Sequence, residues 1–460
     1  MPEQRTVVAA AAELRQGKLS PVELTRECLA RIDQLNSTLK AFITVTPEQA
    51  LEQAKAAEAE IQRGHWRGPL HGIPIALKDV FDTAGVRTTG ASKLFENRIP
   101  TEDAAAVQRL KDAGAVLVGK TNLHEFAYGG STMVSHFGVV RNPWATDRIA
   151  GGSSSGSAVA VATGMCYAAL GSDTAGSIRQ PSAFCGVVGV KPTYGRVSMR
   201  GMLPLAWSYD HAGPITRTVA DAAAVLQAIA GYDGDDVTSR DVPVPDYTAA
   251  LNLQTGPLRL GVARRYFFDG IDDDIDRAFT DAIDVLSGTT AELRDVDVPV
   301  YSDDPAKKAE AYAYHAELVA KSPELYDPET LRRIRNGASV TTAEYIAARR
   351  QLERFRRDAG CLFETVDAIL TPTVVIPPPK IDDLAREPAK LRDVEIITLR
   401  NTRPFNVLGL PTISVPCGFT KAGLPIGLQI TAAPWREDIV LALAHKYEQA
   451  TEWHTRFLQI

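Results

Sequence analysis

The sequence has little cysteine, and its five cysteines follow no recognisable pattern. They lie far apart, are odd in number and include no C-x-x-C pair; they are Cys28, Cys166, Cys185, Cys361 and Cys417. This spacing indicates neither a zinc site nor a disulfide scaffold, and reduced thiols in a cytosolic compartment are expected. The eight histidines are also scattered, so we expect no metal and no other cofactor.

The chain also lacks an excess of positive charge. It has 50 Lys and Arg against 56 Asp and Glu, a net charge of −6 at pH 7. Such a balance gives no electrostatic footprint for a phosphate backbone. The arginine-rich stretch 349–357 is interrupted by Glu353 and followed by Asp358, as in a solvated helix face. We therefore expect no direct binding of nucleic acid.

Long hydrophobic runs are missing as well. No uninterrupted apolar stretch approaches the roughly 18 residues of a membrane span. Residues 1–20 lack the basic-then-apolar order of a signal peptide. Hydrophobic residues at 45% and charged residues at 23% are typical of a folded globular protein. These features predict a soluble, cytoplasmic protein without a membrane partner.

Short apolar runs alternate with helical patterns. Residues 73–77, 116–118 and 167–170 have strand character, and a helical segment at 103–113 separates two of them. This alternation predicts an α/β fold with a central, largely covered sheet. Strand patterns return at 411–419 and 424–431, which predicts one sheet built from both ends of the chain.

The length of 460 residues would allow two or three domains at about 100–200 residues each. The weaker region 235–393, with charged helical stretches, instead indicates a helical elaboration near the site. We therefore predict one domain over residues 1–460.

Two loops of small residues are candidates for chemistry. Residues 151–157 (GGSSSGS) lead into an apolar helix, a setting that favours anions, although a flexible linker is the alternative. In the loop 171–181, small residues before Ser177 allow close approach of a substrate carbonyl. The amides of Thr174, Ala175, Gly176 and Ser177 could converge on a developing oxyanion. Asp173 and Arg179 could pin this turn, or could simply form a buried ion pair.

Lys78 follows the apolar run at 73–77. A lysine in this position commonly extends its amine to the surface. If the strand end is buried, desolvation lowers the pKa of the amine, because the charged form is disfavoured. A neutral lysine can then serve as the general base for a serine nucleophile.

Two literal motif matches point elsewhere. Residues 152–156 fit G-x-S-x-G, which would make Ser154 the nucleophile, but that elbow requires a strand before it, and residues 142–147 are turn-like. Residues 114–121 fit the P-loop pattern, but their centre is a hydrophobic strand, whereas a phosphate cradle requires a loop. We expect neither function.

Taken together, the chain resembles the amidase-signature family. The resemblance is dense from residue 70 to 230, thin in the middle, and returns after residue 402. The matching segments are 72–79 (GIPIALKD), 119–126 (GKTNLHEF), 141–144, 151–157, 171–181, 186–195 (GVVGVKPTYG), 404–418 and 423–429. The resemblance implies an α/β amidase-signature fold with a central mixed β-sheet covered by helices on both faces.

The resemblance also implies roles for individual residues. Ser177 corresponds to the acyl-forming nucleophile, Ser153 to a bridging serine after a cis peptide bond, and Lys78 to the catalytic lysine. The amides of Thr174, Ala175, Gly176 and Ser177 correspond to the oxyanion hole. Ser154, Asp173 and Arg179 correspond to structural positions at the site. Tyr128, Gly129, Gly130 and Ser131 correspond to the acyl side of the substrate pocket.

Two positions differ from the residues that are usual in the family's motifs. Ala175 and Ser155 stand where the family commonly has glycine. Neither change removes a catalytic group, so both bear on substrate range and not on mechanism.

The motifs at 171–181 and 184–198 are most similar to the amidase subunit of the tRNA-dependent amidotransferase. Residues 202–209 look more like stand-alone amidases, and residues 396–403 replace an acidic stretch associated with that subunit. We therefore expect an independent hydrolase of small amides (aryl amides such as anilides, or aliphatic amides), carbamates or esters, with a small-molecule amide substrate and a possible homodimer. The alternatives are a non-catalytic binding protein that retains the fold and the glutamine-hydrolysing subunit.

Overall fold

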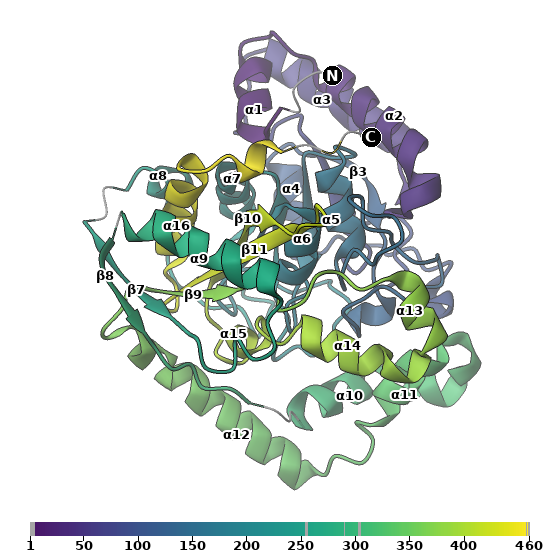
Figure 1. Cartoon of the computed structure of the whole chain (residues 1–460). Helices are drawn as coiled ribbons and strands as arrows, with labels where there is room; N and C mark the ends of the chain where they lie inside the picture. The colour runs from purple at the N-terminus through teal and green to yellow at the C-terminus, as the bar shows by residue number, and fades with distance from the viewer. Residues whose placement is uncertain (1–4, 254–255, 289, 302–304, 457, 459–460) are drawn as a thin grey trace.

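The computed structural model describes residues 5–253, 256–288, 290–301, 305–456 and 458. Within these ranges, eleven strands form one mixed sheet in the order β1-β3-β2-β4-β6-β5-β10-β11-β9-β7-β8 (Figure 1). The strands are β1 (Phe42–Val45), β2 (Pro74–Lys78), β3 (Val116–Thr121), β4 (Ala168–Ser172), β5 (Val188–Lys191), β6 (Ala212–Thr216), β7 (Leu258–Val262), β8 (Thr290–Asp295), β9 (Ala368–Pro372), β10 (Thr412–Phe419) and β11 (Pro425–Ala432). The predicted fold class is confirmed.

Helices flank the sheet along its length. They are α1 (Val7–Arg15), α2 (Pro21–Leu39), α3 (Pro47–Gln62), α4 (Ala105–Asp112), α5 (Ser155–Ala162), α6 (Arg179–Cys185), α7 (Val219–Ile229), α8 (Tyr247–Ala250), α9 (Asp273–Ser287), α10 (Pro305–Lys321), α11 (Pro328–Arg335), α12 (Thr342–Asp358), α13 (Ile381–Arg386), α14 (Leu391–Thr398), α15 (Arg403–Val407) and α16 (Glu437–Gln449). Among the described helices, none combines the length and the apolar character that a bilayer crossing would require.

Both faces of the sheet are covered, as the side chains of β2 show. Ile75 and Leu77 belong to one large hydrophobic cluster, whereas Ala76 belongs to a second cluster with Val159 and Val161 of α5. Because successive strand residues point to opposite faces, the two clusters lie on opposite sides of the sheet. A strand covered on both sides is expected to be apolar throughout, which explains the continuous hydrophobic run in β2.

The sheet is built from both ends of the chain, as predicted. Strand β5 pairs antiparallel with β10, so the N-terminal strands β1–β6 continue directly into the C-terminal pair β10–β11. Region 235–393 differs from expectation, because it adds β7, β8 and β9 to the sheet besides its helices. Strand β8 has the sequence TAELRD and lies at the sheet edge, mostly exposed, so it lacks the apolar pattern of a buried strand. The single-domain organisation stays a prediction.

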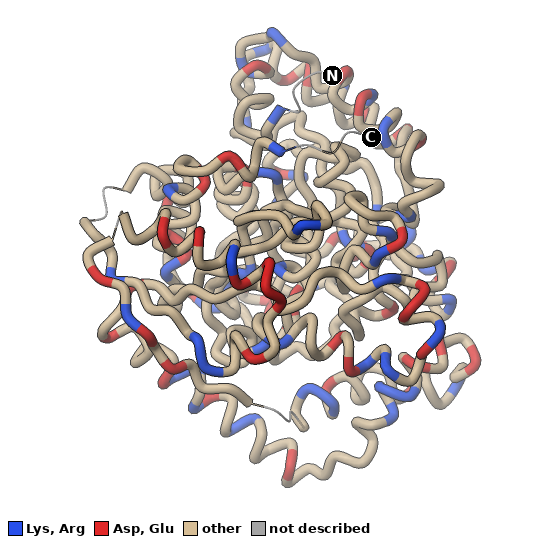
Figure 2. The backbone as a smooth tube through the Cα atoms, viewed as in Figure 1, with Lys and Arg blue, Asp and Glu red and all other residues tan. Residues whose placement is uncertain are grey.

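The charged helices of this region group together at the lower side of the molecule in Figure 1. In α12 only Leu352 is buried, and basic and acidic residues are interspersed along the helix in Figure 2. Two of its arginines turn inward, however. Arg356 lies 3.8 Å from the ring centre of Tyr194 and donates to the carbonyl of Ser208 at 2.5 Å, and Arg349 donates to the Ser208 hydroxyl.

The fold also explains the two literal motif matches. Residues 116–121 form β3, which pairs with both β1 and β2, so this segment is a strand and not a phosphate-binding loop. No strand stands directly before Ser154, which is the residue before helix α5.

Candidate active site

Lys78 is the last residue of β2, where the strand is flanked by the parallel strands β3 and β4. Its side chain is fully buried. The Nζ atom lies 2.6 Å from Ser153 Oγ and 2.7 Å from Ser172 Oγ. Burial lowers the pKa of Lys78 to about 7, and the charges of Asp173 and Asp210 only partly oppose that shift. A substantial share of the amine is therefore uncharged near neutral pH and able to accept a proton.

Ser153 follows a cis peptide bond from Gly152, as the resemblance implies. The N–H of Gly152 donates to Gln180 Oε1 at 2.8 Å. A Cβ atom at residue 152 would lie 3.1 Å from the backbone of Gly130 and Ser131, which explains why glycine occupies this position. The same Gln180 donates through Nε2 to the Gly130 carbonyl at 2.9 Å, so one side chain joins both segments.

Ser177 stands two residues before helix α6 and is 4% exposed. Within the described part of the chain its hydroxyl has no hydrogen-bond partner. Its carbonyl accepts from the N–H of Ser154 at 3.2 Å, which ties the two small-residue loops together. Ser154 Oγ in turn donates to the Ser172 carbonyl at 3.0 Å. The structure thus joins the serine loops through the amide and the hydroxyl of Ser154 and leaves the Ser177 hydroxyl available to a ligand.

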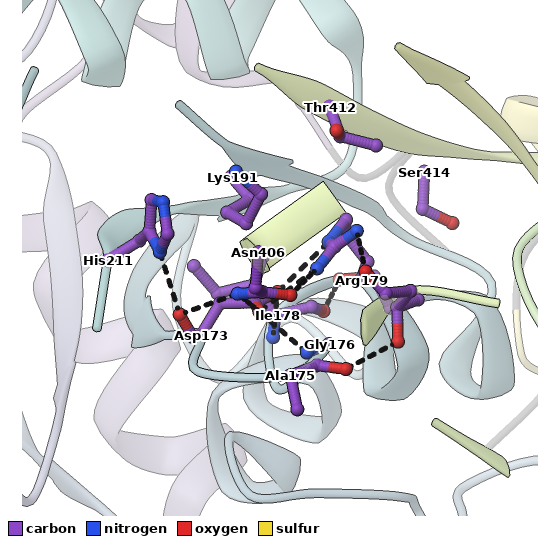
Figure 3. A network of polar contacts seen from close by, with 12 residues as sticks. Asp173, Ala175, Gly176, Ile178, Arg179, Lys191, His211, Asn406, Thr412 and Ser414 are labelled. Carbon is purple, nitrogen blue, oxygen red and sulfur yellow. Dashed lines mark hydrogen bonds and ion pairs between the residues drawn. The ribbon is translucent and has the colours of Figure 1, made fainter. Parts of the chain in front are cut away.

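The turn from Asp173 to Ile178 is organised by the Asp173 carboxylate, as Figure 3 shows. This carboxylate accepts from the amide of Gly176 at 2.6 Å and from that of Ile178 at 3.1 Å. The Gly176 amide therefore already has a hydrogen-bond acceptor within the turn. This corrects the prediction that four amides form the oxyanion hole, because the Gly176 amide is not free to take part. In the described ranges, the amides of Thr174, Ala175 and Ser177 have no hydrogen-bond partner.

Close packing explains which residue before Ser177 must be glycine. Gly176 has φ +131°, and a Cβ atom there would lie 1.9 Å from Thr402 Oγ1. Ala175 has no such conflict, and its carbonyl accepts from Thr402 Oγ1 at 2.7 Å. The departure at position 175 is thus tolerated locally, whereas glycine at 176 is required.

Asp173 and Arg179 form a fully buried ion pair, with Arg179 Nε 3.0 Å from Asp173 Oδ2. Burial alone would raise the pKa of the carboxyl, but the positive charges of Arg179 and Lys191 outweigh it and hold the pKa below its usual range. The remaining guanidinium donors of Arg179 reach three C-terminal groups. These are the Thr402 carbonyl at 2.9 Å, Gln429 Oε1 at 2.9 Å and Asn406 Oδ1 at 2.6 Å.

Asp210 is a buried carboxyl that the sequence patterns did not reveal. It accepts from Thr174 Oγ1 at 2.6 Å and from the amides of Leu205 and Ala206 at 2.9 and 3.0 Å. Burial raises the pKa of Asp210 to about 7, although these hydrogen bonds act in the opposite direction. Sequence reasoning also missed Ser172, Gln180 and Asn406, although Ser172 could have been noticed as the end of a strand beside Asp173.

The predicted pocket segment 128–131 lies beside Gly152 and is held by two helices of the middle region. Arg333 of α11 donates to the Tyr128 carbonyl at 2.6 Å, and Ser131 Oγ donates to Glu395 Oε1 of α14 at 2.6 Å. Arg333 and Glu395 pair with each other at 2.7 Å, and both are buried. The segment is therefore positioned by charged groups far away in the sequence.

Replacing Glu395 with alanine should destabilise the protein by about 3–5 kcal/mol, since it leaves a buried guanidinium without one of its carboxylates. Chemical denaturation followed by circular dichroism measures this. The matched control is Glu387→Ala, which removes a solvent-exposed pair with Lys390 and should change stability by less than about 1 kcal/mol. Equal effects of the two changes would contradict the buried clamp.

The fold, with polar loops gathered at the ends of buried strands, defines the protein as an α/β protein with a polar site at the strand ends of one mixed sheet. The chain belongs to the amidase family: the family model described as Amidase matches residues 23–441. The resemblance drawn from the motifs is confirmed.

Curated relatives cover nearly the whole chain. A glutamyl-tRNA(Gln) amidotransferase subunit of Geobacter metallireducens is 43% identical and covers 96% of each chain. The protein of the same description from Roseiflexus sp. is 44% identical and covers 98% of each chain.

Solved structures share the architecture. A 6-aminohexanoate cyclic dimer hydrolase has a TM-score of 0.90 at 29% identity, over 100% of this chain and 99% of that one. The peptide amidase of Stenotrophomonas maltophilia has a TM-score of 0.83 at 33% identity, over 98% of this chain and 97% of that one. The corresponding glutamyl-tRNA(Gln) amidotransferase subunit of Thermotoga maritima has a TM-score of 0.79 at 35% identity, over 97% of this chain and 95% of that one.

Proposed function

We propose that this protein hydrolyses the C–N bond of a carboxamide with Ser177 as the nucleophile. The observation that carries the proposal is the fully buried Lys78 amine, 2.6 Å from Ser153 Oγ. Neutral Lys78 accepts the proton of Ser153, and Ser153 takes the proton of Ser177 as the Ser177 oxygen attacks the carbonyl carbon. The amides of Thr174, Ala175 and Ser177 stabilise the oxyanion that forms.

Breakdown of the tetrahedral intermediate uses the same groups in the reverse direction. Ser153 gives a proton to the leaving nitrogen, and Lys78 returns the proton that it accepted. The C–N bond breaks and an acyl ester on Ser177 remains. A water molecule then loses its proton to the Ser153–Lys78 pair and attacks the ester, which releases the carboxylic acid and restores Ser177.

For the physiological substrate, the comparisons favour glutamine. The first eight curated relatives, all described as this same subunit of the glutamyl-tRNA(Gln) amidotransferase, are 41–44% identical over 95–98% of this chain. We therefore propose that this chain is the glutamine-hydrolysing subunit of a tRNA-dependent amidotransferase and works together with partner subunits. This reverses the order expected from the motifs, which placed an independent hydrolase first.

An independent hydrolase of small amides, carbamates or esters is the second candidate. One observation favours it: the TM-score is 0.90 for the cyclic dimer hydrolase but 0.79 for the Thermotoga maritima protein. The resemblance drawn from the sequence points the same way, because residues 202–209 look more like those of stand-alone amidases. Glutamate formation from glutamine should be measured with and without the partner subunits of a relative, beside an anilide, an aliphatic amide and a carbamate. Partner-dependent glutamine hydrolysis supports the first candidate, and partner-independent anilide or carbamate hydrolysis without glutamine hydrolysis supports the second.

Ser177→Ala should abolish covalent labelling by a small alkyl fluorophosphonate, since the probe reacts with the activated hydroxyl. Ser154→Ala is the matched control, because Ser154 lies in the literal G-x-S-x-G match but bonds to the Ser172 carbonyl. It should retain labelling. Intact-mass spectrometry measures the adduct. A wild-type protein that never labels would favour the non-catalytic binding protein, and labelling that survives Ser177→Ala would place the nucleophile elsewhere.

A further inference from the structure

His211 is a buried histidine that the proposed mechanism does not use. It directly precedes strand β6, and its side chain is 3% exposed. Its Nδ1 atom lies 2.6 Å from the Tyr209 carbonyl oxygen and 3.1 Å from the Asp173 carbonyl oxygen. Because carbonyl oxygens only accept, Nδ1 must carry the hydrogen, which fixes the tautomer of the neutral ring.

The environment keeps this ring neutral and leaves its other nitrogen unused. Burial, followed by the positive charge of Lys191, lowers the pKa of His211 well below its usual value. Among the described residues, Nε2 has no hydrogen-bond partner although it is buried. Burying an unpaired nitrogen opposes folding, so an apolar side chain would serve better if packing beside Tyr194 were the only role. The Nδ1–H group is therefore the feature that distinguishes histidine here.

The Asp173 carbonyl that His211 contacts belongs to the peptide unit that carries the Thr174 N–H. It receives three donors, each at 3.1 Å: the His211 amide, Asn406 Nδ2 and His211 Nδ1, whose single hydrogen is shared with the Tyr209 carbonyl at 2.6 Å. Figure 3 draws the contacts of His211 and Asn406 with Asp173. In a planar trans peptide the C=O and N–H bonds point in opposite directions. Donors that hold the carbonyl therefore fix the direction of the Thr174 N–H on the other side of the plane. They also polarise the peptide, which strengthens that N–H as a donor.

We infer that His211 is a positioning residue of the oxyanion hole: its Nδ1–H, with Asn406, orients the Asp173–Thr174 peptide so that the Thr174 amide faces the reacting carbonyl oxygen. This inference rests on the proposed hydrolytic function. The role fits the rest of the turn, in which the Asp173 carboxylate and Thr402 hold the neighbouring Gly176 amide and Ala175 carbonyl.

The test compares two substitutions. His211→Leu keeps most of the shape and removes the donor, whereas His211→Asn places an amide nitrogen at the position of Nδ1. The rate constant for Ser177 phosphonylation by a small alkyl fluorophosphonate reports the oxyanion hole without requiring the natural substrate. Misorientation of one donor should slow phosphonylation about tenfold in His211→Leu, less than the loss of a whole donor, and His211→Asn should stay within about twofold of wild type. The inhibition constant of methylboronic acid, which forms a tetrahedral adduct on Ser177, should rise in parallel.

The outcomes separate this inference from the proposed function. A wild-type protein that never labels refutes the hydrolytic function and this role with it. A wild-type protein that labels, with His211→Leu equally fast or His211→Asn as slow as His211→Leu, refutes the positioning role alone. If His211→Leu does not fold, His211→Gln replaces it, because its amide nitrogen falls at the Nε2 position and leaves the Asp173 carbonyl without this donor.

Discussion

Lys78→Met should lower kcat by at least about 10²–10⁴-fold, because it removes the general base and keeps a side chain of similar length. In the wild-type protein, kcat/KM should rise about tenfold per pH unit below a pKa of about 7 and level off above it, since only the uncharged amine accepts a proton. The variant should lose this pH limb. Fluorophosphonate labelling rates between pH 5 and pH 9 measure the pH limb, and steady-state amide hydrolysis measures the loss of kcat.

A variant of Asp210 is the control for the rise of kcat/KM with pH, because the Asp210 carboxyl also has a pKa of about 7 and could cause the same rise. Asp210→Asn removes that titration and keeps Lys78, so the rise with pH should persist but move to lower pH, because the negative charge of Asp210 raises the pKa of Lys78. If Asp210→Asn abolished the limb and Lys78→Met kept it, the titrating group would be the carboxyl and the lysine mechanism would be contradicted.

The same lysine makes a prediction about stability. The folded protein binds the Lys78 proton only below about pH 7, whereas the unfolded chain binds it up to about pH 10. Between these values the unfolded state holds more protons, so this group makes the free energy of unfolding rise with pH. Below pH 7 the cost of burying the ammonium is fully present. Lys78→Met should therefore be more stable than wild type at pH 6, and the difference should shrink towards pH 10 in denaturant titrations.

Gly176→Ala should reduce activity about 10²–10³-fold, the loss expected when an oxyanion donor is displaced. The new methyl group would meet Thr402 Oγ1 at 1.9 Å, and the backbone at φ +131° disfavours any side chain. Because Ser177 is the next residue, the turn must move with the nucleophile attached. Overpacking should also lower the free energy of unfolding by about 1–3 kcal/mol. Labelling kinetics and denaturation measure the two effects.

Ala175→Gly is the matched control one residue earlier. The Ala175 position makes no comparable clash, so removing its methyl group should leave labelling and stability close to wild type. A second test is the double variant Gly176→Ala with Thr402→Gly, which removes the conflicting side chain and should recover part of the activity. If Gly176→Ala labelled at the wild-type rate, the packing argument for the oxyanion turn would be wrong.

The central strands could be predicted from the sequence because burial on both faces imposes a plain pattern. Residues 73–77 predicted β2 (Pro74–Lys78) to within one residue, and residues 424–431 predicted β11 (Pro425–Ala432) equally well. Strand β8 could not be predicted, since an exposed edge requires no apolar alternation. The prediction that Lys78 closes a strand depended on the same strong pattern.

The supporting residues of the site could not be predicted, because their contacts span long stretches of chain. Asp173 and Asn406 are 233 residues apart, and Ser131 and Glu395 are 264 apart. Neither pair has a local signal, since periodicity and capping report only on near neighbours. The engagement of the Gly176 amide by Asp173 was equally hidden, although only three residues separate them, because it depends on the backbone direction of one turn.

The anchoring of Arg179 to Thr402, Asn406 and Gln429 makes the turn that carries Ser177 depend on a late part of the chain. Lys78, Ser153 and Ser177 all leave the ribosome more than 200 residues before these anchors are made. Until then, the guanidinium has Asp173 but lacks its three C-terminal partners, and the turn around Ser177 lacks the contacts of Thr402 and Asn406. The nascent chain should consequently not hydrolyse amides until the segment that carries Thr402, Asn406 and Gln429 has been synthesised and has packed against the turn.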